Sequence, residues 1–284
     1  MKATDLYNRL EKDFVKPSMQ ENWYNGMSEL SDYICDNFKQ RSSGLLCDFT
    51  EEINKVYTAV FPSDNVLIKV LNDDICDAMI FLHHPMVWDL SKDPNKAYYT
   101  INTALLKKMK ERRISLFNFH YPLDNFSEYG NSKTLAEAMG IKVEKPFHEY
   151  GGALCGVIGT TDCKDIHELN TRYSQAVSHE TRLYQYGKSD IIGNRVAIVA
   201  GGGNDVHAVN DVIESGVNVL ISGLSVNNAY ALSAHELEKE HGINLLGGTH
   251  YSSEKFGCIA MCEYFKKLGL ASEFVEGKPC FEDL

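Results

Sequence analysis

Short apolar runs that alternate with amphipathic segments constrain the fold of this chain more than any other feature. The runs occupy residues 56–61, 78–82, 114–119, 154–159, 195–200, 217–222 and 243–246. Between them, segments such as 101–113 and 206–215 repeat apolar residues at the spacing of a helix. A regular succession of strand and helix is typical of crossover units around a largely parallel sheet. The chain is therefore expected to adopt an α/β fold with largely parallel or mixed sheets.

The middle of the chain interrupts this pattern. Pro146 and the pair Gly151–Gly152 separate two similar halves, and 284 residues suit two domains of roughly 150 residues each. We therefore expect a first α/β domain over residues 1–147 and a second over 148–284. The first fifty residues are expected to be mostly helical, with an amphipathic helix over 23–38.

Charge and cysteine usage exclude several classes of protein. The chain has 28 Lys and Arg against 39 Asp and Glu, a formal net charge of −11, so direct nucleic-acid binding is not expected. The 8 cysteines are scattered without a C-x-x-C motif, which is typical of reduced thiols in a cytoplasmic protein. No stretch approaches the roughly 18 consecutive apolar residues of a membrane span, and the N-terminal segment has no apolar leader. A cytoplasmic location without membrane attachment is expected.

Histidines and carboxylates follow three of the expected strands. These groups are His83 with His84, His120 with Asp124, and His250 with Glu254. Ligands of parallel α/β sheets gather at the carboxyl ends of the strands, where such groups would meet. Imidazole and carboxylate together suit Zn²⁺, Mn²⁺ or Fe²⁺ rather than Ca²⁺. The number of donors is sufficient for two ions that share a bridging carboxylate.

Each group also has an explanation without metal. One of two adjacent histidines can accept a backbone hydrogen bond, and His120 can pair with Asp124 inside a turn. Ser252 or Ser253 can open a helix, with Glu254 in its first turn complementing the helix dipole. The joint occurrence of the groups at three strand ends favours the metal interpretation.

Other motifs have structural explanations. Residues 201–203 are three glycines between a strand and a helix, but they lack the G-x-G-x-x-G spacing, so a tight turn is favoured over an anion cradle. Cys258 and Cys262 share one side of a helix and are expected to be buried thiols. Six more histidines are expected in loops or on polar helix faces: His148, His167, His179, His207, His235 and His241.

Three sequence blocks resemble the signature of the Nif-three-like family, whose members are often labelled GTP cyclohydrolase I type 2 homologues. The blocks are FLHHPMVW at 81–88, FHYPLD at 119–124 and GTHYSSE at 248–254. They are similar to the family's H-H-P, H-x-x-L-D and G-H-x-x-S-E motifs, and the resemblance extends over residues 50–284. It implies two interlinked α/β domains with a dinuclear metal site in the cleft between them. It also implies a homo-oligomer, commonly a toroidal hexamer.

The resemblance assigns roles to the residues in these blocks. It implies five metal ligands, which are His83, His84, Asp124, His250 and Glu254. Two divalent ions per chain, Zn, Mn or Fe, are expected, with Glu254 as the bridging ligand. His120 is a further site residue, either a ligand or a side chain that orients Asp124. We expect it to be the catalytic group that transfers a proton.

The implied function is hydrolysis. The chain is expected to be a dinuclear-metal-dependent hydrolase that acts on a nucleotide or related phosphorylated small molecule through a metal-bridging hydroxide. The chain departs from the family after residue 221, where Leu224 replaces an acid and Asn227 and Asn228 replace a histidine pair. This departure favours an alternative: a non-catalytic metal-binding regulatory or scaffold protein that forms a ring oligomer.

Overall fold

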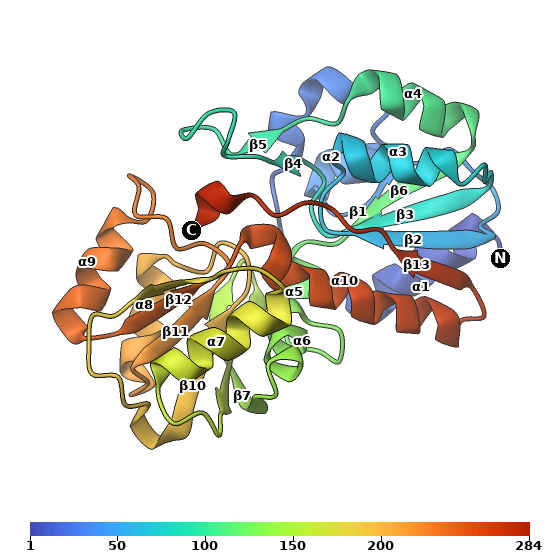
Figure 1. The fold of residues 1–284 in the computed structure, drawn as a ribbon. Coiled ribbons are helices and arrows are strands. Elements are labelled where there is room, and N and C mark those ends of the chain that lie inside the picture. The colour runs from blue at the N-terminus through green and yellow to red at the C-terminus, as the bar shows by residue number, and fades with distance from the viewer. The chain divides into compact units, whose positions relative to one another are not determined.

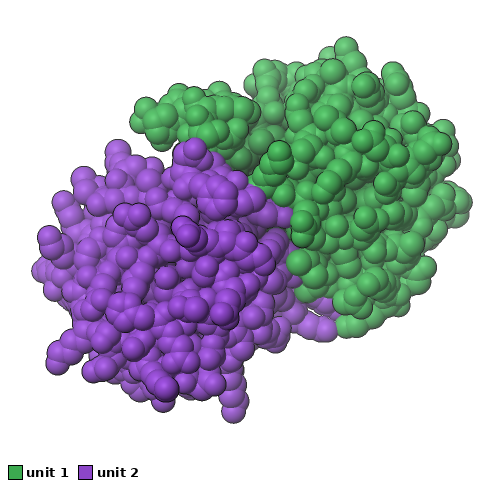
Figure 2. Space-filling view, viewed as in Figure 1, with its two compact units in different colours: residues 1–123, 258–278 green, residues 124–257, 279–284 purple.

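The computed structural model describes residues 1–284, which divide into two compact units (Figures 1 and 2). Unit 1 consists of residues 1–123 and 258–278, and unit 2 of residues 124–257 and 279–284. The boundary predicted at 147/148 falls inside a strand of unit 2, β7 (Lys142–Tyr150). Pro146 does not interrupt the fold there because β7 lies at the edge of its sheet, where proline is tolerated. Gly151 and Gly152, both with positive φ, form the turn that follows β7.

Unit 1 is built on a five-stranded sheet with the strand order β1-β6-β3-β2-β13. The strands are β1 (Gly44–Cys47), β2 (Lys55–Ala59), β3 (Ala78–Leu82), β6 (Ile114–Asn118) and β13 (Ala271–Phe274). All neighbours are parallel except β1 and β6. The expected parallel arrangement of the first half is thus confirmed.

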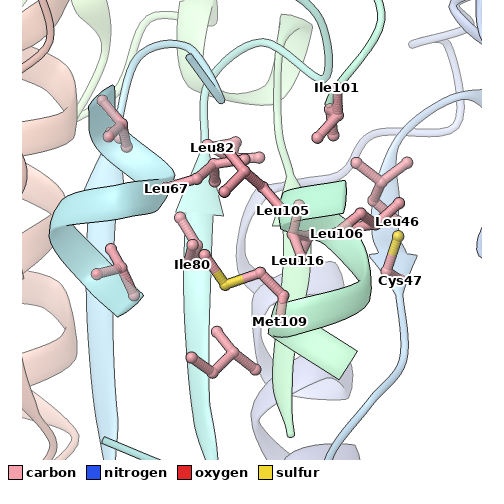
Figure 3. Packing of buried hydrophobic residues seen from close by; sticks show 14 of the residues in the cluster. Leu46, Cys47, Leu67, Ile80, Leu82, Ile101, Leu105, Leu106, Met109 and Leu116 are labelled. Atoms are coloured by element: carbon pink, nitrogen blue, oxygen red, sulfur yellow. The ribbon is translucent and has the colours of Figure 1, made fainter. Parts of the chain in front are cut away.

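Helices surround the sheet of unit 1. They are α1 (Ala3–Phe14), α2 (Asp36–Arg41), α3 (Asp64–Asn72), α4 (Thr103–Glu111) and the second half of α10 (His250–Lys267). A separate hairpin of β4 (Val87–Trp88) and β5 (Tyr98–Tyr99) follows β3. Leu67 of α3 and Leu106 of α4 belong to one buried cluster with Ile80 of β3 (Figure 3). Full burial of each such side chain contributes roughly 1.5–3 kcal/mol. Phe81, the next residue of β3 after Ile80, packs against Phe265 of α10, with the two ring centroids 5.6 Å apart.

The helix predicted over 23–38 is wrong. Residues 23–35 contain only two 3-10 turns, Tyr24–Gly26 and Ser28–Leu30, and α2 begins at Asp36. The sequence Asn25-Gly26 contains poor helix formers, and the indole N–H of Trp23 donates a hydrogen bond to Glu21 instead of lying on a helix face.

Unit 2 has a six-stranded mixed sheet with the order β7-β8-β10-β11-β12-β9. Its further strands are β8 (Ala153–Thr160), β9 (Arg182–Tyr184), β10 (Arg195–Val199), β11 (Val219–Ser222) and β12 (Asn244–Gly247). The three central strands β10, β11 and β12 are parallel, and the outer pairings are antiparallel. The expected fold class, α/β with largely parallel or mixed sheets, is confirmed in both units.

The helices of unit 2 are α6 (Asn131–Ala138), α7 (Ile166–Val177), α8 (Val206–Glu214) and α9 (Leu232–His241), and α5 (Tyr121–Asp124) lies at the unit boundary. The helix expected over 206–215 is confirmed as α8. Asp165 caps α7 by accepting hydrogen bonds from the backbone of His167 and Glu168. Asp162, near the start of the same helix, pairs with Arg172. No helix in the chain combines the length and the apolar character needed to cross a membrane.

Candidate metal centre

Three histidines of unit 1 meet where adjacent parallel strands end. His83 and His84 follow β3, and His120 follows β6. The potential ligand atoms of these three rings all lie within 4.8 Å of one another, and His83 and His84 are completely buried. The convergence follows from the parallel pairing of β3 with β6, which brings the two carboxyl ends to the same edge.

Hydrogen bonds and ring contacts set the orientation of these imidazoles. Nδ1 of His83 lies 3.0 Å from the carbonyl oxygen of Phe119, so this nitrogen carries the proton and Nε2 carries the lone pair. The ring of His84 stacks on Phe61, with centroids 4.6 Å apart, and meets the edge of Trp23 at 5.8 Å. Aromatic packing of this kind restricts ring rotation and limits access of water.

The first fifty residues contain no residue that the sequence predicted for the site. Two side chains of this region nevertheless contact the histidines. Glu21 lies 3.0 Å from Nδ1 of His120, and Trp23 packs edge-on against the same ring at 5.1 Å. Sequence reasoning missed both residues. Glu21 is one of 39 acidic residues and follows no strand, so no local signal separates it from the others.

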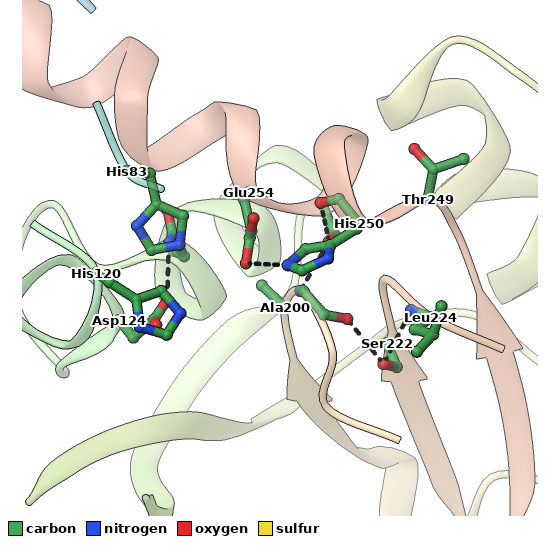
Figure 4. Close-up of polar contacts among 12 residues, drawn as sticks. His83, His120, Asp124, Ala200, Ser222, Leu224, Thr249, His250 and Glu254 are labelled. Atoms are coloured by element: carbon green, nitrogen blue, oxygen red, sulfur yellow. Dashed lines mark hydrogen bonds and ion pairs between the residues drawn. The ribbon is translucent and has the colours of Figure 1, made fainter. Parts of the chain in front are cut away.

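Unit 2 holds the other predicted ligands. His250 and Glu254 lie one turn apart on α10, with Nε2 of His250 3.1 Å from Oε1 of Glu254 (Figure 4). Both are buried, and carboxylate oxygens of Asp124 and Glu254 lie within 4.8 Å of each other. Asn131 holds Asp124 in place, since its Nδ2 donates to Oδ1 over 2.8 Å. The expected combination of imidazole and carboxylate therefore occurs within this unit.

The helix that carries His250 begins earlier than predicted. α10 starts at His250, two residues before Ser252. Thr249 Oγ1 accepts from the backbone N–H of Ser252, and Ser252 Oγ accepts from the backbone N–H of Thr249, each over 3.1 Å. This reciprocal pair is a capping box, which fixes the first turn of the helix. Asp283 adds a further acceptor, because its Oδ2 lies 2.8 Å from the backbone nitrogen of His250.

The glycine loop after β10 forms a tight turn, as predicted, and also approaches the ligands closely. Gly201 has φ +70°, and a Cβ at this position would lie 2.1 Å from Oε1 of Glu254. Its backbone N–H donates to Oγ of Ser253 over 2.9 Å. Glycine is required here both for the left-handed backbone and for the missing Cβ.

The segment that departs from the family pattern is well packed. Leu224 is buried, and its backbone nitrogen lies 3.3 Å from Oγ of Ser222 (Figure 4). The backbone N–H of Ser225 donates to the carbonyl of Asp283 over 2.8 Å. Oδ1 of Asn228 accepts from the backbone of Tyr230 just before α9. These residues therefore serve packing and turn formation within unit 2.

Two histidines expected on polar surfaces are instead buried. Nδ1 of His148 lies 2.8 Å from the carboxylate of Asp211. Nδ1 of His235 lies 2.9 Å from the hydroxyl of Tyr186 and 3.5 Å from the carboxylate of Glu238. Burial raises the pKa of Glu238 to about 8 and lowers the pKa of His235. The expectation of solvated imidazoles is wrong here because each ring lies within hydrogen-bonding distance of a polar side chain, Asp211 for His148 and Tyr186 for His235. Cys258 and Cys262 are buried, as predicted.

The chemistry of the donors suits a divalent transition metal. Unit 1 offers three imidazoles, and unit 2 offers one imidazole with two carboxylates. Nitrogen and oxygen donors of this kind bind Zn²⁺, Mn²⁺ or Fe²⁺, and buried ligands with fixed second partners bind more firmly than mobile ones. The buried histidine and glutamate groups thus have the composition to hold a metal ion.

The family model described as Duf34/NIF3 (NGG1p interacting factor 3) matches residues 33–278. A protein named GTP cyclohydrolase 1 type 2 homolog from Archaeoglobus fulgidus is 28% identical over 261 residues, covering 87% of this chain and 94% of that protein. A protein of the same name from Borreliella burgdorferi is 27% identical over 215 residues, covering 76% and 79% of the two chains.

Solved structures share the fold. A structure described as protein ybgI, of unknown function, has a TM-score of 0.74 at 21% identity and covers 99% of this chain and 100% of its own. Reduced HcgD from Methanocaldococcus jannaschii has a TM-score of 0.69 at 23% identity, with 98% of each chain covered. These likenesses extend over both units.

Proposed function

The chain belongs to the Duf34/NIF3 family, and on that premise we propose that it is a dinuclear-metal-dependent hydrolase of a nucleotide or related phosphorylated small molecule. The observation that carries the proposal is the cluster of the buried His83 and His84 with the half-buried His120 in unit 1. A second buried group, with His250 and Glu254, supplies the carboxylate that a pair of ions requires. The names of the relatives support a nucleotide as substrate class.

In this proposal five side chains hold two ions of Zn, Mn or Fe. The ligands are His83, His84, Asp124, His250 and Glu254, with Glu254 bound to both ions. Carboxylate oxygens of Asp124 and Glu254 within 4.8 Å of each other suit two ions separated by about 3.5–4 Å. The proton on Nδ1 of His83 leaves Nε2 for the metal, as in many metal-binding histidines.

The residues around the ligands have defined tasks. When bound, two such ions lower the pKa of a shared water and stabilise developing negative charge. His120 is the proton-transfer group: Glu21 accepts a hydrogen bond from its Nδ1, so Nε2 carries the lone pair that can take up a proton. Trp23 and Phe61 surround the imidazoles and limit the access of bulk water. The atom attacked would be C8 of a purine ring or the phosphorus of a phosphoester.

The test combines metal analysis with hydrolysis assays. Protein purified without chelator should contain two ions per chain and hydrolyse GTP or a phosphoester from a panel. His120→Ala should keep both ions and lose roughly 10²–10⁴-fold in kcat, the usual contribution of an acid–base group. His207→Ala, at an exposed histidine, is the matched control and should change neither property.

Two results would contradict this assignment. Loss of metal from His120→Ala would make His120 a ligand rather than the proton-transfer group. Turnover that persists at the wild-type rate in both His120→Ala and Glu254→Gln would come from another protein or another site.

A second candidate function is a non-catalytic regulatory or scaffold protein that binds metal and forms a ring. The packing role of Leu224 and the turn role of Asn228 favour it, because both replace residues with ionisable side chains in the family pattern. A metal-loaded protein with no turnover on the panel would support this candidate. In either case we propose a cytoplasmic toroidal hexamer, which light scattering of the purified protein would test.

A further inference from the structure

We propose that Glu21 is a positioning residue for His120, which fixes both the orientation of its ring and the nitrogen that carries the proton. The inference rests on the proposed function, in which Nε2 of His120 transfers a proton. It adds a residue from the N-terminal segment, outside the three sequence blocks, to the machinery of the site.

The carboxylate of Glu21 is buried and surrounded by donors. Its side chain is only 3% exposed. Oε2 lies 3.0 Å from Nδ1 of His120 and 2.5 Å from Nε1 of Trp23, and Oε1 lies 3.0 Å from the backbone nitrogen of Tyr121. Two of these three donors belong to His120 and the residue after it, so the carboxylate is held to that segment through both of its oxygens.

This geometry determines the tautomer of His120. An ionised carboxylate only accepts hydrogen bonds, so Nδ1 of His120 must carry a proton. In the neutral ring, Nε2 is then unprotonated and basic. A carboxylate behind a histidine has this orienting effect at many metal and acid–base sites.

Neighbouring rings complete the constraint on His120. Trp23 meets the imidazole edge-on at 5.1 Å, and His84 lies 4.7 Å away between centroids. The indole N–H of Trp23 also donates a hydrogen bond to Glu21, so one carboxylate holds both the imidazole of His120 and the indole that packs against it. Rotation of His120 would break its bond to Glu21 and displace it from these contacts.

Glu21→Gln separates this role from general support of the segment. Glutamine has nearly the same volume but a single acceptor oxygen, and its amide N–H₂ would face other donors. The three hydrogen bonds to Glu21 cannot all persist. Glu29→Gln is the matched control, since Glu29 lies in the same N-terminal segment and accepts from Thr100, away from His120.

The measurements are the kcat and KM of the metal-loaded protein, the metal content, and crystal structures of both variants. Glu21→Gln should lower kcat by about 10–100-fold at unchanged KM and metal content, the usual effect of losing an orienting partner. Its crystal structure should show the His120 ring rotated from the wild-type position. Glu29→Gln should match the wild type in all of these.

A Glu21→Gln variant with the wild-type ring position, or with unchanged kcat, would overturn the inference. Equal losses of stability in the two variants with activity retained would make Glu21 a structural contact only. If the wild type hydrolyses nothing, the proposed function fails, while the position of the His120 ring in Glu21→Gln still decides whether Glu21 orients it.

Discussion

Gly201→Ala is expected to weaken metal binding while leaving the fold intact. A Cβ at this position would lie 2.1 Å from Oε1 of Glu254 and 3.1 Å from Nε2 of His250, whereas real Cβ atoms essentially never come within 3.0 Å of such a neighbour. The carboxylate must therefore move by about 1 Å, against a tolerance of about 0.2 Å in metal–ligand distances. Alanine at φ +70° also adds roughly 1–2 kcal/mol of backbone strain.

Gly202→Ala is the control, because a Cβ at Gly202 meets nothing within 4 Å. The assay is metal content per chain after purification without chelator, followed by titration of the metal-free proteins. Gly201→Ala should bind metal at least about 10-fold more weakly than Gly202→Ala. In urea denaturation, the metal-free Gly201→Ala protein should lose about 1–2 kcal/mol of unfolding free energy. Equal metal affinity in the two variants would refute the close approach of Gly201 to the ligands.

Three further perturbations test other features. Glu254→Gln should reduce bound metal by more than one equivalent per chain and Asp124→Asn by about one, measured by elemental analysis; equal retention in Glu254→Gln would exclude a bridging role. Burial raises the pKa of Glu238 from 4.5 to about 8, so its contribution to stability is complete below pH 4.5 and is lost as the pH rises towards 8, by about 1.4 kcal/mol per unit. Glu238→Gln should accordingly melt higher than the wild type at pH 8 and lose this advantage towards pH 5, and parallel melting curves across that range would contradict the assignment. Leu106→Ala, at a fully buried position, should cost about 2–5 kcal/mol in urea denaturation, and a loss below 1 kcal/mol would show that the core around α4 closes over the cavity.

The strands and most helices were predictable because their signals are local. The apolar runs before His83 and His120 specify β3 and β6, and the order of elements specifies a parallel pairing that brings the two strand ends together. The family blocks then supplied the expected roles of the histidines. These are properties of short segments, in which hydrophobic period and turn residues decide the structure.

Other features depend on contacts between distant segments. The two units are discontinuous in sequence, and β13, which no periodic pattern predicted, joins the sheet of unit 1 from residues 271–274. The edge strand β7 accepts Pro146 only because no further strand pairs beyond it. An interruption in the sequence therefore did not mark a boundary in the fold.

The sequence by itself identified the side chains that we propose as metal ligands, and the tertiary structure decided which other residues lie against them. Glu21 contacts His120 across 99 residues, and this contact depends on how the segment between α1 and α2 folds back without an α-helix. Gly201 is required because the loop after β10 passes within van der Waals distance of Glu254. A carboxylate or a glycine has no distinctive local pattern, so only the packing of remote segments brings these residues to the candidate site.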